Sequence, residues 1–229
     1  MRREPVRVHV DRTRARQSSL RLALKSAVWL ACLYPLARLL WLFRTDGLGP
    51  NPIEEVTHST GDAALIILLA ALAVTPLRRA TGWNELASLR RPVGLFAFFY
   101  ATLHLLTWIV LDQFFAFEYM LEDIRERPYI TVGTIAFLLL VPLAVTSTKG
   151  WIRRLGKRWT KLHRLVYGSA ALAVLHYIWL VKADLRRPLV FAAILAALLL
   201  ARTPPARAAF ERLRAGRRAR LEGAASPTR

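Results

Sequence analysis

The stretch that decides the fold is KLHRLVYGSAALAVLHYIWLVK, residues 161–182. It is an apolar segment long enough to cross a bilayer, with His163 near one end and His176 near the other. Ionisable side chains inside a membrane span are costly and rare, so both histidines are candidate functional residues. At 1.5 Å of rise per residue, a helix separates the two imidazoles by about 20 Å. That distance predicts two centres at two depths of the membrane.

The composition places the chain among membrane proteins. Hydrophobic residues make up 55% of its 229 positions, and long apolar runs recur. The net charge of +19 would suggest nucleic-acid binding in a soluble protein. Here the basic residues lie in short segments between the apolar runs, where they set membrane topology, so we expect a lipid bilayer and no nucleic acid as partner. The single cysteine, Cys32, cannot form an internal disulfide or hold an iron–sulfur cluster.

Six apolar runs predict six transmembrane helices, and the first is interpreted as a retained span because it lacks a convincing signal-peptide cleavage site. The runs cover residues 20–43, 62–77, 92–111, 130–147, 161–182 and 185–201. The segments between them alternate between basic ones, such as 148–161, and acidic or neutral ones, such as 112–129. Since basic loops stay in the cytoplasm, the pattern predicts an all-α integral membrane protein, a bundle of six transmembrane helices with both termini cytoplasmic.

The predicted organisation has three parts. A basic cytoplasmic arm covers residues 1–19, a transmembrane domain covers 20–201, and a basic cytoplasmic tail covers 202–229. The outer segments 44–61 and 112–129 are the candidate docking surface for a partner protein.

A third histidine, His104, lies in the third predicted span at a depth similar to that of His176. If the third and fifth spans are neighbours, the two imidazoles can ligate one metal from opposite sides. A haem suits this arrangement, because two histidines supply both axial positions and the flat macrocycle fills the apolar interior. Closed axial positions favour electron transfer over oxygen binding. A zinc or copper site would need three or four ligands at one depth, which the spans do not supply.

His163 predicts a second centre near the cytoplasmic face, although no second histidine lies at its depth. Arg90 falls on the same helix face as His104, toward the cytoplasm. Arg90 or Arg91 could hold a haem propionate or a flavin phosphate, and a purely topological role explains the pair about as well. A single histidine can also simply hydrogen-bond across helices, so the haem hypothesis depends on the pair at matching depth.

Several segments between residues 45 and 183 carry a family resemblance. They are GLGPNPIEEVTHSTG, VTPLRR, LRRPVGLFAFFYATLHLL, ERPYITVGTIAF, LAVTSTKGW, LGKRWTKLHRLVY and LHYIWLVK. Together they resemble the MsrQ family (formerly YedZ), the haem-binding membrane subunits of bacterial periplasmic methionine sulfoxide reductase systems, within the wider ferric-reductase-like transmembrane family. The resemblance implies one or two haems b, with His104, His163 and His176 as ligands and Arg90 and Arg91 as the basic pair before the third span. It also implies FMN as a cofactor.

The resemblance further implies a multi-pass protein of the bacterial inner membrane. Such a subunit takes electrons from the quinone pool and passes them to a periplasmic MsrP-like molybdopterin reductase, which repairs oxidised methionines in periplasmic proteins. We therefore expect an electron-transfer subunit with no substrate chemistry of its own. Two other classes stay open: a histidine-based metal or proton transporter, and a structural membrane anchor for a periplasmic enzyme. The transporter predicts flux without a haem spectrum, and the anchor predicts that the histidines are dispensable for the partner's activity.

Overall fold

The structure, a computed structural model, describes residues 5–181 and 183–224. Residues 1–4 of the predicted arm, Lys182 of the fifth predicted span and residues 225–229 of the tail lie outside this part. Every element in the described part is a helix, which confirms the all-α class. The helices are α1 (Pro5–Arg44), α2 (Pro52–Thr81), η1 (Asn84–Leu89), α3 (Arg90–Leu106), η2 (Thr107–Asp112), α4 (Phe117–Glu126), α5 (Pro128–Val145), α6 (Lys149–Leu155), α7 (Lys157–Leu162), α8 (Leu165–Leu180), α9 (Arg186–Leu200) and α10 (Pro204–Ala224).

Contacts divide the chain into two units, Met1–Gly47 and Leu48–Arg229. The first unit contains α1, a single helix that joins the predicted basic arm to the first predicted span. The second unit contains all the other helices and therefore His104, His163 and His176. The candidate site thus belongs to one unit.

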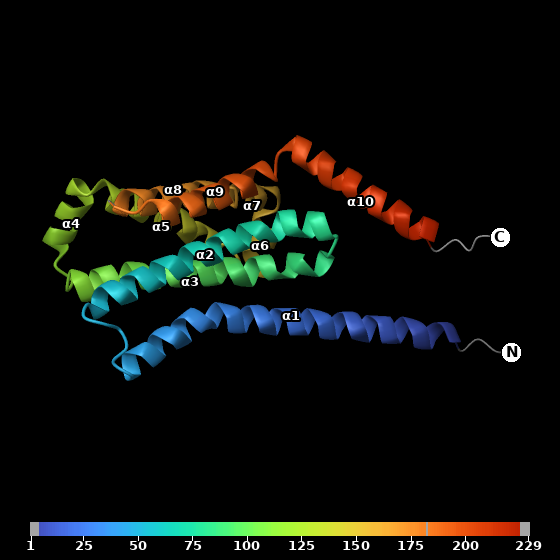
Figure 1. Cartoon of the computed structure of the whole chain (residues 1–229), viewed down its shortest axis with the longest axis horizontal. Coiled ribbons are helices and arrows are strands. Elements are labelled where there is room, and N and C mark those ends of the chain that lie inside the picture. Colours follow the sequence, from blue (N-terminus) through green and yellow to red (C-terminus); the bar gives the residue numbers. More distant parts are fainter. Residues whose placement is uncertain (1–4, 182, 225–229) are drawn as a thin grey trace. The chain divides into compact units, whose positions relative to one another are not determined.

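Two helix pairs form the framework of the second unit. α2 packs along α3, and α5 packs along α8 (Figure 1). α3 also contacts α5, and in that contact the rings of Phe98 and Phe137 stack with their centroids 5.6 Å apart. These apolar faces hold together the helices that carry the histidines.

α2 is longer than the second predicted span, 62–77, because the sequence before that span forms a strong helix start. The Asn51 side chain accepts a hydrogen bond from the Glu54 backbone N–H, and Pro52 occupies the first turn, where no N–H is needed. The helix ends at Gly82, whose φ of +78° suits glycine and whose N–H bonds to a carbonyl of the last turn. Part of the predicted outer loop is therefore helical.

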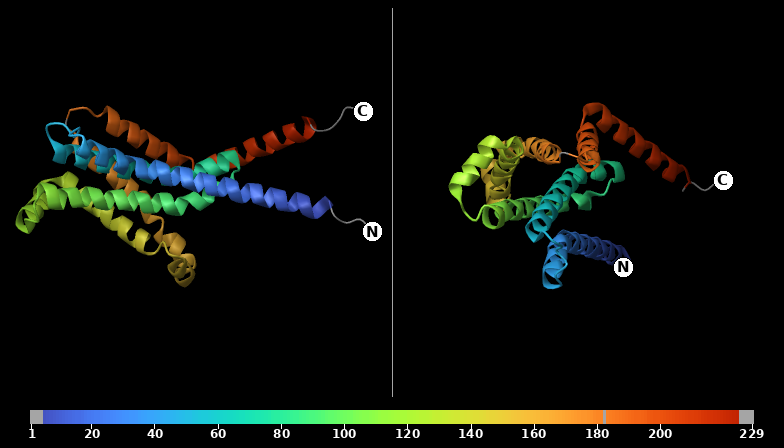
Figure 2. Two further views of the ribbon diagram at one scale, coloured as in Figure 1. Left: turned by 90° about the horizontal axis from the view of Figure 1, so that it is seen from below. Right: turned by 60° about the vertical axis from the view of Figure 1, so that its left-hand side comes forward.

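In the described part of the chain, four helical segments are long and apolar enough to cross a membrane. They are Leu22–Arg44, Pro52–Thr81, Asn84–Asp112 and Pro128–Val145. A fifth span follows if α9 and the first part of α10 are counted as one, although the two helices are bent by 73° relative to each other. The bend is visible in Figure 2. These helices describe a multi-pass membrane protein, while the number six and the cytoplasmic position of the termini stay predictions.

The fifth predicted span, 161–182, is divided in the structure. α7 ends at Leu162 and α8 begins at Leu165, so His163 and Arg164 lie in a tight turn between two helices. α8 is strongly apolar but has only 16 residues, about 24 Å of helical rise. The estimate of depth along one unbroken helix therefore applies only to the part of the span after this turn.

Candidate functional site

The structure brings His104 of α3 and His176 of α8 together. Their ring centroids are 6.1 Å apart, and the ring planes are inclined by 76°. The two residues lie on helices of different pairs, since α3 packs on α2 and α8 packs on α5. The approach of these two imidazoles is therefore a property of the assembled bundle.

Each of the two imidazoles is oriented by a backbone carbonyl of the helix that packs against it. His104 Nδ1 lies 3.0 Å from the Thr57 carbonyl oxygen on α2, and His176 Nδ1 lies 2.6 Å from the Tyr129 carbonyl oxygen on α5. A carbonyl oxygen can only accept, so each Nδ1 carries the proton and donates it. In both neutral rings Nε2 then keeps its lone pair, which is the tautomer that a metal ligand needs.

A glycine makes room for each ring. A Cβ on Gly61 of α2 would lie 3.0 Å from Cε1 of His104, and a Cβ on Gly133 of α5 would lie 2.7 Å from Nδ1 of His176. Any larger residue would therefore push the imidazole away from the carbonyl that orients it. Each glycine follows its carbonyl by four residues, so the carbonyl and the gap share one face of the helix.

The arrangement of the pair fits a single metal between the rings. Imidazole nitrogens bind metals at about 2 Å, which places the centres of two opposed rings about 6 Å apart. The observed 6.1 Å agrees with that spacing. Among the side chains that the structure describes, no group of three or more His, Cys, Asp or Glu residues is placed to hold a metal ion. Two neutral imidazoles at this spacing fit a haem, whose iron they would hold between them.

The chain changes its helical form directly after His104. α3 ends at Leu106, and η2 continues it as a π-helix. The Thr107 hydroxyl donates to the His104 carbonyl at 2.8 Å, and the Thr57 hydroxyl donates to Thr107 at 3.3 Å. Short π-helical segments occur often at functional sites, and this one ties α2 to α3 beside the histidine.

His163 has its own surroundings, apart from the paired histidines. Its ring stacks on Trp159 with the centroids 3.8 Å apart, and its Nδ1 donates to the Trp159 carbonyl at 3.2 Å. Its Nε2 is buried and has no hydrogen-bond partner among the residues that the structure describes. His163 therefore presents the same tautomer as the other two histidines; its Nε2 makes no hydrogen bond of normal geometry, although the Leu143 carbonyl lies close to the ring.

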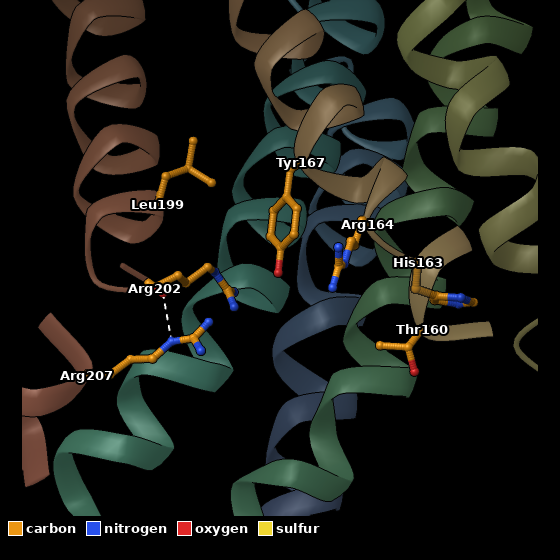
Figure 3. A pocket seen from close by; sticks show the side chains of 7 residues that line it. All are labelled: Thr160, His163, Arg164, Tyr167, Leu199, Arg202 and Arg207. Carbon is orange, nitrogen blue, oxygen red and sulfur yellow. Dashed lines mark hydrogen bonds between the residues drawn. The ribbon is translucent and has the colours of Figure 1, made fainter. Parts of the chain in front are cut away.

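An open pocket of about 420 Å³ lies beside His163, where α8 begins and α9 ends. It is lined by Thr160, His163, Arg164, Tyr167, Leu199, Arg202 and Arg207. In Figure 3 the side chains of Arg164, Tyr167 and Arg202 extend into the same space, whereas the His163 ring points away from Arg202.

Arg90 and Arg91 are exposed at the start of α3, and neither is among the residues that line this pocket. Arg90 nevertheless lies within electrostatic range of Arg202 and of Tyr167. The predicted basic pair is thus the edge of a larger basic region, which the structure completes with arginines from the turn after α9 and from α10.

Sequence reasoning found the three histidines but missed the residues that orient them. Thr57 and Tyr129 contribute only backbone carbonyls, which carry no side-chain signal. The available signal was a glycine within each of two apolar helices, Gly61 and Gly133, each preceding its histidine by the same number of residues.

Comparison with known families agrees with this architecture. The family model described as "Ferric reductase like transmembrane component" matches residues 60–174, half of the chain. The matched segment covers α2 from Thr60 onward, all of α3 and α5, and α8 as far as Val174. It includes His104 and His163 and ends two residues before His176. The fold and the match place the chain in the ferric-reductase-like class of transmembrane proteins.

Curated relatives refine this class. Proteins described as "Protein-methionine-sulfoxide reductase heme-binding subunit MsrQ" are similar over most of their length. The one from Herminiimonas arsenicoxydans is 53% identical over 78% of this chain and 84% of its own. The one from Rhodospirillum rubrum is 56% identical over 83% of this chain and 91% of its own. The one from Xanthomonas campestris pv. campestris (strain 8004) is 50% identical over 81% of this chain and 88% of its own. The chain belongs to the MsrQ family.

Proposed function

We propose that the chain is the haem b-binding membrane subunit of a methionine sulfoxide reductase system. It takes electrons from the quinone pool, directly or through FMN, and delivers them to a periplasmic MsrP-like molybdopterin reductase that repairs oxidised proteins. The observation that carries this proposal is the pairing of His104 with His176 at 6.1 Å, each with Nδ1 donating to a backbone carbonyl. The curated relatives support it through their description as heme-binding subunits.

His104 and His176 are the proposed axial ligands. When bound, the haem supplies one-electron redox chemistry. The chain supplies two neutral imidazoles held by the Thr57 and Tyr129 carbonyls, the gaps at the two glycines and an apolar bundle that excludes water. With both histidines on the iron, the site would suit electron transfer rather than reaction with oxygen.

His163 is the proposed ligand of a second haem, because its Nε2 is buried without a partner. Arg90 and Arg91 remain candidates for holding a propionate or a flavin phosphate at this end of the bundle, and Arg90 lies near the other arginines there. The number of haems, one or two, follows from whether His163 binds iron.

The remaining parts of the proposal concern the membrane. We propose six spans in a bacterial inner membrane with both termini in the cytoplasm, a basic arm over 1–19, a transmembrane domain over 20–201 and a tail over 202–229. Segments 44–61 and 112–129 would face the periplasm and dock the reductase. α4 in the second segment carries four acidic side chains and two exposed aromatic ones, Phe117 and Tyr119. No substrate chemistry is assigned to this chain alone.

Visible spectra of the detergent-purified protein, oxidised and reduced, test the haem proposal. We expect a b-type spectrum in the wild type, lost or much reduced in both His104→Ala and His176→Ala, and retained in His58→Ala, an exposed histidine on α2 that serves as control. His163→Ala should lower the haem content to about half if a second haem is present, and leave it unchanged if there is one. A colourless wild type after haem supplementation would refute the proposal and favour the transporter.

A further inference from the structure

The pocket at the start of α8 and the end of α9 is strongly basic. Three arginines line it, Arg164, Arg202 and Arg207, and no acidic side chain is among its lining residues that the structure describes. They come from separate parts of the chain: the turn before α8, the turn after α9, and α10. Two further arginines, Arg79 and Arg90, lie close enough to Arg202 to repel it. A concentration of positive charge without acidic neighbours favours binding of an anion, which would offset the repulsion.

Arg202 is the most firmly held of these residues. Its Nη2 donates to the Leu72 carbonyl of α2, and its guanidinium lies over the Tyr167 ring, 5.2 Å from the centroid. Burial lowers the pKa of Arg202, as do the charges of Arg79 and Arg207, although Tyr167 raises it. The group is thus fixed in place by other contacts while its charge is left poorly compensated.

Two guanidinium nitrogens in this region are buried without a hydrogen-bond partner. They are Arg202 Nε and Arg79 Nη1, and neither has an acceptor in the described part of the chain. Buried donors normally have acceptors, and the cost of leaving one unpaired is about 1–3 kcal/mol, more for charged groups. The donors of Arg164 and Arg207 project from the other sides of the same space, and Figure 3 shows them around the Tyr167 hydroxyl. The pocket therefore offers several charge-assisted donors to one ligand.

We propose that this pocket binds the phosphate group of an anionic ligand. Planar guanidinium groups match phosphate oxygens, and several of them around one space can satisfy all the oxygens of one group. The pocket volume of about 420 Å³ accommodates a phosphorylated headgroup rather than a lone ion. The pocket is open and its apolar side is Leu199 at the end of a membrane helix, so an anionic phospholipid at the cytoplasmic surface can reach it as readily as a soluble phosphate ester. This inference does not depend on the proposed electron transfer.

The orientation of His163 separates this pocket from a haem site. In Figure 3 its ring extends away from Arg202, so the arginines and the free Nε2 of His163 do not converge on one point. A haem held by His163 could still send a carboxylate toward Arg164. The test below therefore measures ligand binding and haem content on the same samples.

The test compares the melting temperature of the full-length detergent-purified protein with and without phosphate-bearing probes. Cardiolipin, which is anionic, is compared with phosphatidylcholine, which is zwitterionic, and glycerol 3-phosphate with glycerol, which lacks only the phosphate. We expect cardiolipin or glycerol 3-phosphate, but not its counterpart, to raise the melting temperature by about 3–6 °C. Arg164→Gln/Arg207→Gln should abolish the rise and weaken binding by roughly tenfold or more, as measured by native mass spectrometry or titration. These two arginines are exposed, so their replacement should leave the fold intact.

Arg153→Gln/Arg158→Gln is the matched control, since it removes the same charge from exposed residues of α6 and α7 outside the pocket. The control should respond like the wild type, and Arg164→Lys/Arg207→Lys should recover part of the response. A response to cardiolipin assigns the site to a lipid, and a response to glycerol 3-phosphate assigns it to a soluble phosphate ester; both support the proposal. Equal responses to both members of each probe pair, or a full response in the double glutamine variant, would overturn it. Loss of haem from Arg164→Gln/Arg207→Gln with an unchanged response to the phosphate probes would also overturn it, because the arginines would then bind haem carboxylates.

Discussion

At the scale of single residues, the candidate haem site depends on small features around each imidazole. His176 donates to the Tyr129 carbonyl, and Gly133 on the same helix leaves the space that its ring occupies. The same features recur at His104, where Thr57 and Gly61 take these roles. Both hydrogen bonds join residues 47 apart in the chain, so the two helix pairs hold their histidines in the same way. A ligand fixed in this way needs no reorientation when it binds a metal.

Gly133→Ala tests this role. The added Cβ would lie 2.7 Å from His176 Nδ1, so the ring must move from the carbonyl that orients it. We expect haem affinity to fall roughly 10–100-fold, the range found when groups that orient a metal ligand are changed, as measured by haem titration of the apoprotein. Helix propensity alone would make alanine the more stable residue, so a loss cannot be explained by a weaker helix. Gly94→Ala, whose Cβ meets no atom within 4 Å, is the control, and equal affinity of the two variants would refute the role of Gly133.

At the scale of helices, the contact between α5 and α8 places His176. Ser169 and Ala170 on α8 are fully buried, and the Ser169 hydroxyl donates to the Ala136 carbonyl on α5 at 2.8 Å. Small residues allow two helices to approach closely, which is the usual basis of helix packing inside membranes. The position of His176 relative to α5, and hence its bond to Tyr129, depends on this close approach.

Ala170→Leu should therefore separate α8 from α5. Overpacking at a fully buried position costs about 1–3 kcal/mol, and we expect a lower melting temperature in detergent together with a lower haem content. Ala171→Leu places a leucine at the next position, which is exposed. It should change neither the melting temperature nor the haem content. Similar destabilisation by both substitutions would show that α8 tolerates no bulk on either face and would contradict the packing argument.

At the scale of the whole molecule, the distribution of charge predicts the topology. The segment 148–161 contains six Lys or Arg residues and no acid, while 112–129 contains five acidic residues. Positively charged loops resist transfer across the membrane, so the first should be cytoplasmic and the second periplasmic. This arrangement would put the basic pocket and the docking segments at opposite ends of the bundle.

Cysteine labelling tests this topology. In a Cys32→Ser background the chain has no other thiol, so a cysteine placed at exposed Lys157 or exposed Glu118 reports on one loop each. We expect a membrane-impermeant maleimide to label Glu118→Cys in spheroplasts and to label Lys157→Cys only after the membrane is permeabilised. The opposite pattern would invert the predicted topology, and labelling of both in intact spheroplasts would exclude the predicted alternation of the loops.

Much of the fold could be predicted because its causes are local. Apolar runs and basic loops predicted a helical multi-pass protein, and the helices lie close to the predicted spans. Boundaries were less accurate where caps decide them, as at Asn51, and where a turn interrupts an apolar run, as at His163. Helical depth also predicted that His104 and His176 lie at similar levels, but it could not show that their helices bring them within 6.1 Å.

The sequence by itself determined the membrane class, the approximate helices and the three histidines, since hydropathy, charge and residue type are read along the chain. The tertiary structure decided which histidines meet, which carbonyls and glycines orient them, and that Arg164, Arg202 and Arg207 share one pocket. The reason is that each of these contacts joins positions far apart in the chain, so it exists only once the helices have packed. Backbone carbonyls and gaps at glycines, in particular, acquire their function from the neighbour that packs against them.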